Sequence, residues 1–371
     1  MFIKKTRAVF RFAMAAICLT AVCAFPAHAA KVPALELEAD ANATLDSINL
    51  VEKEFITIDY KADYALDEAL AKGVADKKAL EAFISEKLTD GLPFNYETLR
   101  LACSTFAATT TEGDHIMARN MDLAYSKNFL VHTKPKNGYE SLSMTPGYML
   151  GYTNNFPESK LGRLWTLAAP YYSFDGINEK GLSVAILLVQ DKVVVQNTGK
   201  APITTTLAVR MILDKAATVD EALALLEQHD MRSMANTNFH YHIADANGNS
   251  VVVEYVDNKI SVVRPTGFGH PVTNYYLTPG LADKVIDGQD RMEKLVKALD
   301  ETRGVVSNDK AWKMLDSVKA VHDYDEVNKI DYMTAYSILY NNSKRTMDIC
   351  IEGKFDKIYS FTFGDDGFGK K

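Results

Sequence analysis

The sequence predicts an α+β fold in which two antiparallel β-sheets are stacked between two layers of helices. The main observation is the order of the expected elements beyond residue 100: strands, two helices, strands, further helices and final strands. A second observation is that strands and helices do not alternate regularly, which argues against a doubly wound parallel sheet. The length of 371 residues, finally, is enough for one large domain with an accessory segment.

The first 29 residues have the pattern of a secretory signal peptide. Four basic residues precede an apolar stretch from Phe12 to Phe25, and Ala27-His28-Ala29 supplies a small-x-small cleavage pattern. The apolar stretch is too short for a comfortable membrane span, and no other long apolar stretch follows it. We therefore expect an exported protein, periplasmic or secreted, that begins near Ala30 and has no membrane span.

Removal of this signal would delete four positive and no negative charges, which changes the formal net charge from −7 to −11. Such an acidic chain is unsuited to nucleic acid, because neutralisation of phosphates supplies most of that affinity. Of the four cysteines, only Cys103 and Cys350 lie outside the signal. In an exported protein the two could form a disulfide. We favour the alternative, a free Cys103 thiol.

Residues 30–102 are expected to form a helical segment ahead of a main domain over residues 103–371. Helical periodicity is clearest at residues 66–72 and 79–88, and residues 31–100 contain no cysteine and no histidine. The segment is therefore expected to be either a small helical subdomain or a propeptide that is cut away before Cys103.

The main domain begins with a hairpin, in which a strand from residue 101 and a strand ending at residue 122 are joined by a turn at 111–114. Strands are then expected at 129–133, 164–168 and 182–189. Two helices follow at 204–216 and 219–228, the second opened by a capping box of Thr218 and Glu221. Next come strands at 238–245, 250–256 and 259–264, helices at 289–301 and 309–321, and strands at 334–340, 346–352 and 358–363.

Cys103 is the candidate nucleophile of this domain. A thiol that attacks an amide at neutral pH needs a nearby cation or a base, and no histidine is obviously placed to serve. Cleavage of the Ala102–Cys103 bond would supply the base, because the freed α-amine has a pKa of about 8 in model compounds. The sequence thus predicts that a bond far inside the chain is cut before the thiol can act.

His240 and His242 are the other side chains that raise a chemical possibility. They lie two residues apart on an expected strand, on the side opposite Phe239 and Tyr241. Such a pair can bind a metal ion, but no cysteine or third histidine lies near in sequence. We therefore expect a polar strand face and no metal site.

Four further residues could complete a site around Cys103. Arg119 and Asp122 lie on the paired strand of the hairpin, where Arg119 could favour the thiolate and Asp122 could hold the α-amine. An ordinary salt bridge between these two is the plain alternative. Asn178 and Asn274 carry neutral amides that could stabilise an oxyanion, although asparagine is also common in turns for conformational reasons.

Four sequence blocks together resemble the choloylglycine hydrolase family. They are Cys-Ser-Thr-Phe from residue 103, Ala-Arg-Asn-Met-Asp from residue 118, Phe-Asp-Gly-Ile-Asn-Glu-Lys-Gly-Leu from residue 174, and Val-Thr-Asn from residue 272. The likeness extends over residues 103–363. That family consists of N-terminal-nucleophile (Ntn) hydrolases and includes bile salt hydrolases and penicillin V acylases.

The resemblance implies a four-layer αββα fold and hydrolysis of linear amides through an acyl-enzyme on Cys103, with no metal or cofactor. Matched by motif, Arg119 and Asp122 correspond to the family's active-site Arg and Asp. Asn178 and Asn274 correspond to the asparagines assigned to the oxyanion and substrate carbonyl. Arg291 fits the place of a later family Arg that opens a helix, although it could equally be a surface residue of that helix.

Two departures from the family bear on maturation and substrate. About 70 residues separate the export signal from Cys103, as in the long-propeptide acid ceramidase and acyltransferase relatives. The segment between Asn274 and Arg291 is short, which argues against the tetramer-forming extension of many bile salt hydrolases. The expected partners are a small N-acyl amide substrate and, after cleavage, the chain's own 30–102 segment.

The sequence leaves the substrate and two other functions open. Bile salts, penicillin V, N-acyl amino acids and N-acylethanolamines all remain candidate substrates. Tyrosine and phenylalanine residues within 139–152 and 171–174 could line an acyl pocket or could simply be core. An acyltransferase could use the same acyl-enzyme, and a non-catalytic binding protein could use the same scaffold.

Overall fold

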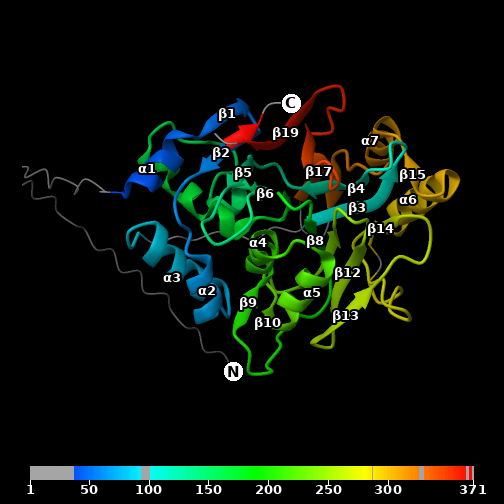
Figure 1. Cartoon of the computed structure of the whole chain (residues 1–371), viewed down its shortest axis with the longest axis horizontal. Helices are drawn as coiled ribbons and strands as arrows, with labels where there is room; N and C mark the ends of the chain where they lie inside the picture. The colour runs from blue at the N-terminus through cyan, green and yellow to red at the C-terminus, as the bar shows by residue number, and fades with distance from the viewer. Residues whose placement is uncertain (1–36, 93–100, 286, 326–329, 365–366, 370–371) are drawn as a thin grey trace, which may run out of the picture. The chain divides into compact units, whose positions relative to one another are not determined.

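Two nine-stranded β-sheets lie at the centre of the protein (Figure 1). The structure is a computed structural model that describes residues 37–92, 101–285, 287–325, 330–364 and 367–369. Strand counts and absences below refer to these ranges.

The first sheet runs from edge to edge through nine strands, in the order β1 (Asn49–Glu52), β2 (Phe55–Tyr60), β5 (Asn128–Thr133), β6 (Ser141–Pro146), β7 (Asp175–Asn178), β8 (Ser183–Val189), β11 (Asn238–Ala244), β12 (Ser250–Val256) and β13 (Lys259–Val263). All neighbours are antiparallel except β2 and β5, which are parallel.

The second sheet runs in the order β14 (His270–Val272), β3 (Leu101–Thr110), β4 (His115–Leu123), β17 (Ile330–Asn341), β18 (Thr346–Ile351), β19 (Ile358–Gly364) and β20 (Gly367–Gly369). Two short strands, β15 (Val305–Val306) and β16 (Asp323–Asp325), pair with β3 and β17. A separate parallel pair consists of β9 (Pro202–Thr204) and β10 (Asp230–Arg232).

Helices cover the outer face of each sheet. On the first sheet, α4 (Thr205–Lys215) contacts β7 and β8, and α5 (Val219–Glu227) contacts β11. On the second, α6 (Gln289–Thr302) and α7 (Asn308–Ser317) lie beside β3 and β4, as Figure 1 shows. Their apolar faces form a core with the sheet, in which Leu299 and Leu315 contact Phe106 and Ile116. The predicted αββα layering of two antiparallel sheets is confirmed.

The N-terminal segment is not wholly helical, contrary to the prediction. It contains α1 (Ala39–Asp46), α2 (Leu66–Lys72) and α3 (Lys77–Leu88), and the last two match the predicted helices. Between α1 and α2, however, the hairpin of β1 and β2 joins the first sheet. The sequence of β2, Phe-Ile-Thr-Ile-Asp-Tyr, is rich in β-branched and aromatic residues, which favour strands.

One expected strand of the main domain is wrong, and several strands, among them β6, were not expected. Residues 164–168 were expected to be a strand but lie within a 3₁₀ helix, η2 (Leu161–Tyr172), which follows a shorter one, η1 (Gly147–Leu150). Strand β6 was not predicted, because its Ser-Leu-Ser-Met-Thr-Pro sequence carries a weak apolar signal. The capping of α5 is as predicted at Thr218, whose hydroxyl accepts from the backbone N–H of Glu221 at 3.3 Å.

None of the helices in the described ranges is long and apolar enough to cross a membrane. The predicted signal peptide, residues 1–29, lies outside those ranges and stays a prediction.

Candidate active site

Cys103 lies on β3, with its side chain fully buried between the strands around it. Across the β3–β4 hairpin it faces Met121, and Ala102 faces Asp122. The sulfur lies 3.4 Å from Nη2 of Arg119 and 3.7 Å from Sδ of Met121. The bond predicted to be cut is therefore held within a paired strand, with one predicted site residue against the sulfur and another beside residue 102.

Arg119 is paired with a different carboxylate from the one expected. Its Nε lies 2.9 Å from Oδ2 of Asp175, and both side chains are fully buried. The plain alternative of an Arg119–Asp122 salt bridge is therefore wrong. Asp175 was missed by the sequence analysis, although it stands three residues before Asn178 in one of the quoted blocks.

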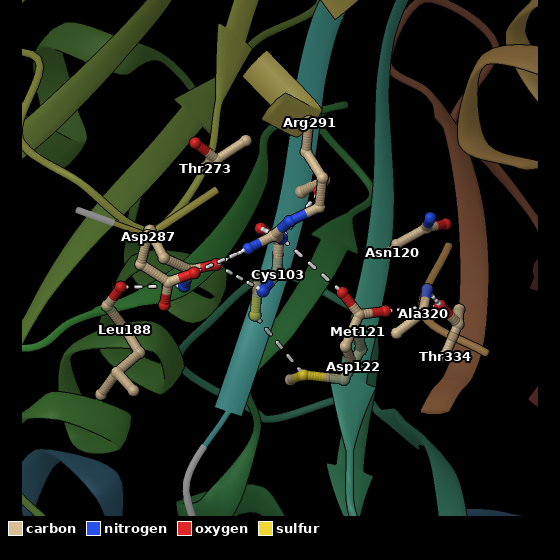
Figure 2. A network of polar contacts seen from close by, with 12 residues as sticks. Cys103, Asn120, Met121, Asp122, Leu188, Thr273, Asp287, Arg291, Ala320 and Thr334 are labelled. Atoms are coloured by element: carbon tan, nitrogen blue, oxygen red, sulfur yellow. Dashed lines mark hydrogen bonds and ion pairs between the residues drawn. The ribbon is translucent and has the colours of Figure 1, made fainter. Parts of the chain in front are cut away.

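Asn274 and Arg291 hold the backbone of Cys103, and Figure 2 shows Arg291 beside Cys103. The N–H of Cys103 donates to Oδ1 of Asn274 at 2.8 Å, and Nη1 of Arg291 donates to the carbonyl of Cys103 at 2.6 Å. The two side chains also bond to each other, since Nη2 of Arg291 donates to Oδ1 of Asn274 at 3.0 Å. The prediction that Arg291 belongs to this site, and is not merely a surface residue of α6, agrees with its position.

A glycine at the start of α6 makes room for Arg291. Gly288, the N-cap residue, has φ of +82°, which L side chains rarely adopt. A Cβ at this position would lie 2.8 Å from Nη2 of Arg291 and 2.9 Å from Cβ of Thr273. Both the backbone conformation and the close approach of the guanidinium therefore favour glycine.

Asp122 is buried beside residue 102 with one oxygen bonded and one free. Its Oδ1 accepts from the hydroxyl of Thr334 at 2.5 Å, and that hydroxyl also accepts from the N–H of Ala320 at 2.9 Å. Its Oδ2 lies 3.7 Å from Nη1 of Arg291 and has no hydrogen-bond partner among the described residues. Burial raises the pKa of Asp122, while Arg291 and Thr334 lower it. The free oxygen is available to a new donor near residue 102.

Asn178 does not belong to the site, which corrects the prediction. Its Nδ2 donates to the carbonyls of Leu213 and Ala216 at 2.9 and 2.7 Å. Its Oδ1 accepts from the N–H groups of Lys180 and Leu182, both at 3.1 Å. With all of these contacts made, Asn178 closes the β7–β8 turn and ties it to α4, and it has no donor left for an oxyanion.

Asn274 also contacts the nucleophile differently from the prediction. Its Nδ2 donates to the carbonyl of Leu188 at 2.9 Å, so Oδ1, and not the amide donor, faces Cys103. In the uncut chain Asn274 thus positions the backbone nitrogen of Cys103.

The Cys103 thiol is protonated in the uncut chain at neutral pH. Burial raises its pKa to about 11, opposed by the charges of Arg119 and Arg291 and reinforced by those of Asp122 and Asp175. Two cations and two carboxylates therefore surround one sulfur, and loss of the polypeptide before residue 103 would change this balance. Cys350 is also a buried free thiol, so the disulfide alternative is wrong.

The two histidines of β11 are buried and hydrogen-bonded. His240 contacts Glu254 at 3.2 Å and the carbonyl of Thr273 at 2.8 Å. His242 contacts the hydroxyls of Thr105 and Ser250 at 2.7 and 2.8 Å. The expected polar strand face therefore points into the protein. The described residues contain no group of three or more His, Cys, Asp or Glu side chains arranged to hold a metal ion.

The aromatic residues considered for an acyl pocket are buried in the core, except Tyr139, which is half-buried. Tyr148 lies edge-on to Phe174, Tyr152 contacts Phe129, and Tyr171 is fully buried. Their burial agrees with the alternative that these side chains are ordinary core.

Comparison with known proteins finds one family and relatives with amide-hydrolase names. Residues 103–272 match the family of linear amide C-N hydrolases, choloylglycine hydrolase family. A bile salt hydrolase/transferase of Clostridium perfringens is 27% identical over 172 residues, which are 43% of this chain and 50% of that protein. A penicillin V acylase of Pectobacterium atrosepticum is 27% identical over 191 residues, which are 46% of this chain and 50% of that protein. The chain thus matches about half the length of these curated relatives.

Solved structures share the fold. Crystal structures of two variants of conjugated bile acid hydrolase from Clostridium perfringens superimpose with TM-scores of 0.52 and 0.54. They are 18% and 17% identical to this chain, and each alignment covers 70% of this chain and 92% of the other. The match to the choloylglycine hydrolase family of linear amide C-N hydrolases therefore begins at Cys103 and extends over residues 103–272.

Proposed function

We propose that the protein is a self-processing cysteine amidohydrolase that cleaves linear amides of N-acyl compounds. The observation that carries this proposal is the arrangement at Cys103. A guanidinium lies against its sulfur, and its backbone nitrogen and carbonyl are both held by side chains. The family match begins at the same residue, which supports Cys103 as the first residue of the mature domain.

Maturation would begin with attack of the Cys103 thiol on the carbonyl carbon of Ala102. The C–N bond breaks, the thiol proton passes to the released nitrogen, and a thioester joins Ala102 to the sulfur. Water then hydrolyses the thioester, which leaves a carboxylate on Ala102 and a free thiol and α-amine on Cys103. Asp122, whose backbone pairs with that of Ala102 and whose Oδ2 accepts no hydrogen bond from the described residues, would bind the new ammonium.

Turnover would repeat this chemistry on a substrate amide. The α-amine of Cys103 accepts the thiol proton and delivers it to the leaving amine, the acyl group stays on the sulfur, and water releases it as an acid. Asn274 would keep the α-amine in place, as it holds the same nitrogen in the uncut chain. Arg119 and Arg291 would offset negative charge that develops on the sulfur and the substrate.

We infer that the N-terminal segment stays bound after the cut. Strand β2 lies inside the first sheet, between β1 and β5. Beyond the sheet, the hydroxyl of Tyr60 donates to the carbonyl of Leu167 at 2.7 Å, and that of Tyr64 donates to Asp214 at 2.6 Å. These contacts support a mature enzyme of two chains. The predicted signal peptide would direct its export.

An acyltransferase is the second candidate function. The Clostridium perfringens relative is named as both hydrolase and transferase, and an acyl-enzyme can pass its acyl group to an amine in place of water. Incubation with amine acceptors, followed by a search for new amide products, distinguishes the two functions.

Intact-mass measurement and N-terminal sequencing of the purified protein test the proposal, together with assays on bile salts, penicillin V, N-acyl amino acids and N-acylethanolamines. Cys103→Ala is expected to leave the chain uncut and without hydrolysis. Cys350→Ala, the matched control at the other buried thiol, is expected to be processed and active. A Cys103→Ala protein that is still cut and still hydrolyses amides would contradict the proposal.

A further inference from the structure

The guanidinium of Arg119 is fully buried, and its two ends contact groups of different kinds. At one end, Nε pairs with Oδ2 of Asp175 at 2.9 Å. At the other end, Nη2 lies 3.4 Å from the sulfur of Cys103 and 3.4 Å from that of Met121. Nη1 donates to the carbonyl of Ile186 at 2.8 Å, so the plane of the group is fixed. One charge is thus shared between a carboxylate and a thiol.

The carboxylate of Asp175 is itself held by two phenols from the other sheet. The hydroxyl of Tyr336 donates to Oδ2 at 2.7 Å, and that of Tyr340 donates to Oδ1 at 2.5 Å. Both tyrosines lie on β17, four residues apart and so on one face of the strand. All three side chains are fully buried. The Asp175 carboxylate thus accepts two buried hydrogen bonds in addition to its ion pair with Arg119.

We propose that Asp175, Tyr336 and Tyr340 are positioning residues that set how much of the Arg119 charge acts on the sulfur of Cys103. The inference rests on the proposed function, in which Cys103 is the nucleophile, and extends it to three residues that do not touch the sulfur.

The reasoning follows from charge sharing at low dielectric. The carboxylate draws on the positive charge of Arg119, and each phenol that donates to the carboxylate takes up part of its negative charge. Loss of a phenol hydroxyl strengthens the hold of Asp175 on Arg119 and weakens the field of Arg119 at the sulfur. Loss of the Asp175 carboxylate charge has the opposite effect, because more of the Arg119 charge then acts on the sulfur. The substitutions therefore move the thiol pKa in opposite directions, whereas damage to packing has no reason to do so.

Other charged groups face the same sulfur and stay constant in this comparison. Asp122 and Arg291 act on Cys103 from β4 and α6. His242 lies within the field of Arg119 from β11, and burial lowers its pKa well below the ordinary value, so it is neutral. None of these three residues contacts Tyr336 or Tyr340 through a hydrogen bond or ion pair that the structure records.

The test measures the rate at which iodoacetamide alkylates Cys103 as a function of pH, read at that residue by peptide mass spectrometry. Tyr336→Phe and Tyr340→Phe are each expected to raise the apparent pKa of the thiol by about half a unit to one unit, whereas Asp175→Asn lowers it by about one unit or more. Tyr255→Phe is the matched control, because Tyr255 is buried and its hydroxyl has no hydrogen-bond partner in the described ranges.

A double-mutant cycle identifies the route of the effect. In an Arg119→Gln background, Tyr336→Phe is expected to leave the thiol pKa unchanged. Asp175→Asn leaves the buried guanidinium of Arg119 without its carboxylate, which costs folding free energy and can prevent folding. In that case the tyrosine variants and the double-mutant cycle test the inference. Two results would overturn the inference. One is that Tyr336→Phe and Tyr340→Phe change the thiol pKa no more than Tyr255→Phe does. The other is that Tyr336→Phe shifts the thiol pKa equally with and without the Arg119→Gln substitution. Alkylation of Cys103 can be followed in cut or uncut chains, so a failure of the proposed function is seen separately as absent processing and hydrolysis.

Discussion

Asn178 and Asn274 show how the same side chain serves two purposes according to where its amide is bonded. Every polar atom of the Asn178 side chain is used to close a turn and tie it to α4. Asn274 instead bridges β8 and the nucleophile, between the carbonyl of Leu188 and the N–H of Cys103. The residue type alone does not predict which asparagine closes a turn and which one contacts the nucleophile. Substitution of each residue is expected to distinguish the two roles.

Asn178→Ala is expected to lower the free energy of unfolding by about 2–4 kcal/mol, because buried carbonyl and N–H partners are left unsatisfied. The folded fraction should still be cut before Cys103, since Asn178 makes no contact there. Asn274→Ala is expected to stop or strongly slow the cut, because the Cys103 nitrogen loses its acceptor. Urea denaturation and N-terminal sequencing measure the two effects. Equal loss of processing per folded molecule in both variants would contradict this division of roles.

Burial of His270 is expected to make the folded protein less stable at acid pH. Burial lowers its pKa to about 4, against about 6.5 in an unfolded chain. Between these values the unfolded chain binds a proton that the folded protein does not, so stability present above pH 6.5 is lost as the pH falls towards 4. The loss for this one residue is about 3 kcal/mol.

Urea denaturation at pH 7 and pH 5 measures this effect. His270→Gln, which can still bond to Ser250, is expected to lose less stability between the two pH values than the unchanged protein does. His322→Gln is the control, since that side chain is 72% exposed. A wild-type pH dependence in the His270 variant would rule out the assignment.

At the scale of elements, the sequence predicted those with strong periodicity and missed those whose place depends on distant partners. Helices α4 and α5 and strand β8 carry long, regular apolar patterns and lie where they were expected. The apolar run within η2 fits a strand or a helix equally well over so few residues. Strand β2 pairs in parallel with β5, some seventy residues later, and no local pattern encodes that pairing.

The candidate site was predictable where its residues lie in recognisable sequence blocks, and not where they depend on strand pairing. Cys103, Arg119, Asp122, Asn274 and Arg291 come together as expected, from β3, β4, the residues after β14, and α6. Asp175 and Thr334 were missed because their roles follow from pairing between strands that are distant in sequence. The register of β17 against β4 sets Thr334 opposite Asp122, and no local pattern encodes that register.

Strand β2 supplies a test of whether the N-terminal segment is a bound subunit. Ile58 is fully buried on β2, whereas Leu50 on β1 is 60% exposed. Ile58→Ala is expected to weaken attachment of the cut segment by about 2–4 kcal/mol through the cavity it leaves. The segment should then separate at lower urea concentration, as followed by size-exclusion chromatography of processed protein. Leu50→Ala serves as the control; segments that separate equally easily in both variants would show that β2 does not hold the subunit.

At the scale of the whole molecule, the proposed cut would divide one sheet between two chains. The N-terminal chain supplies β1 and β2, and the other chain supplies the remaining seven described strands of that sheet. Further contacts extend to the C-terminal part, where Lys357 and Tyr359 both bond to Glu52 on β1. The histidine of β5, His132, lies 2.8 Å from Asp59 on β2 and 2.7 Å from Glu140. The sheet is thus complete in the uncut chain, so its folding would come before the proposed cut.

This order has a consequence for refolding. In the uncut chain, β2 and β5 belong to one molecule. The entropic cost of pairing them is that of closing a loop, which does not depend on protein concentration. After the cut the same pairing needs two molecules to meet, and the effective concentration supplied by the connection is lost. Uncut Cys103→Ala protein is therefore expected to refold from urea with a yield independent of concentration. Processed protein is expected to refold with a yield that rises with concentration and falls when the N-terminal chain is first removed. Equal, concentration-independent yields from both forms would mean that the larger chain completes its fold without β1 and β2.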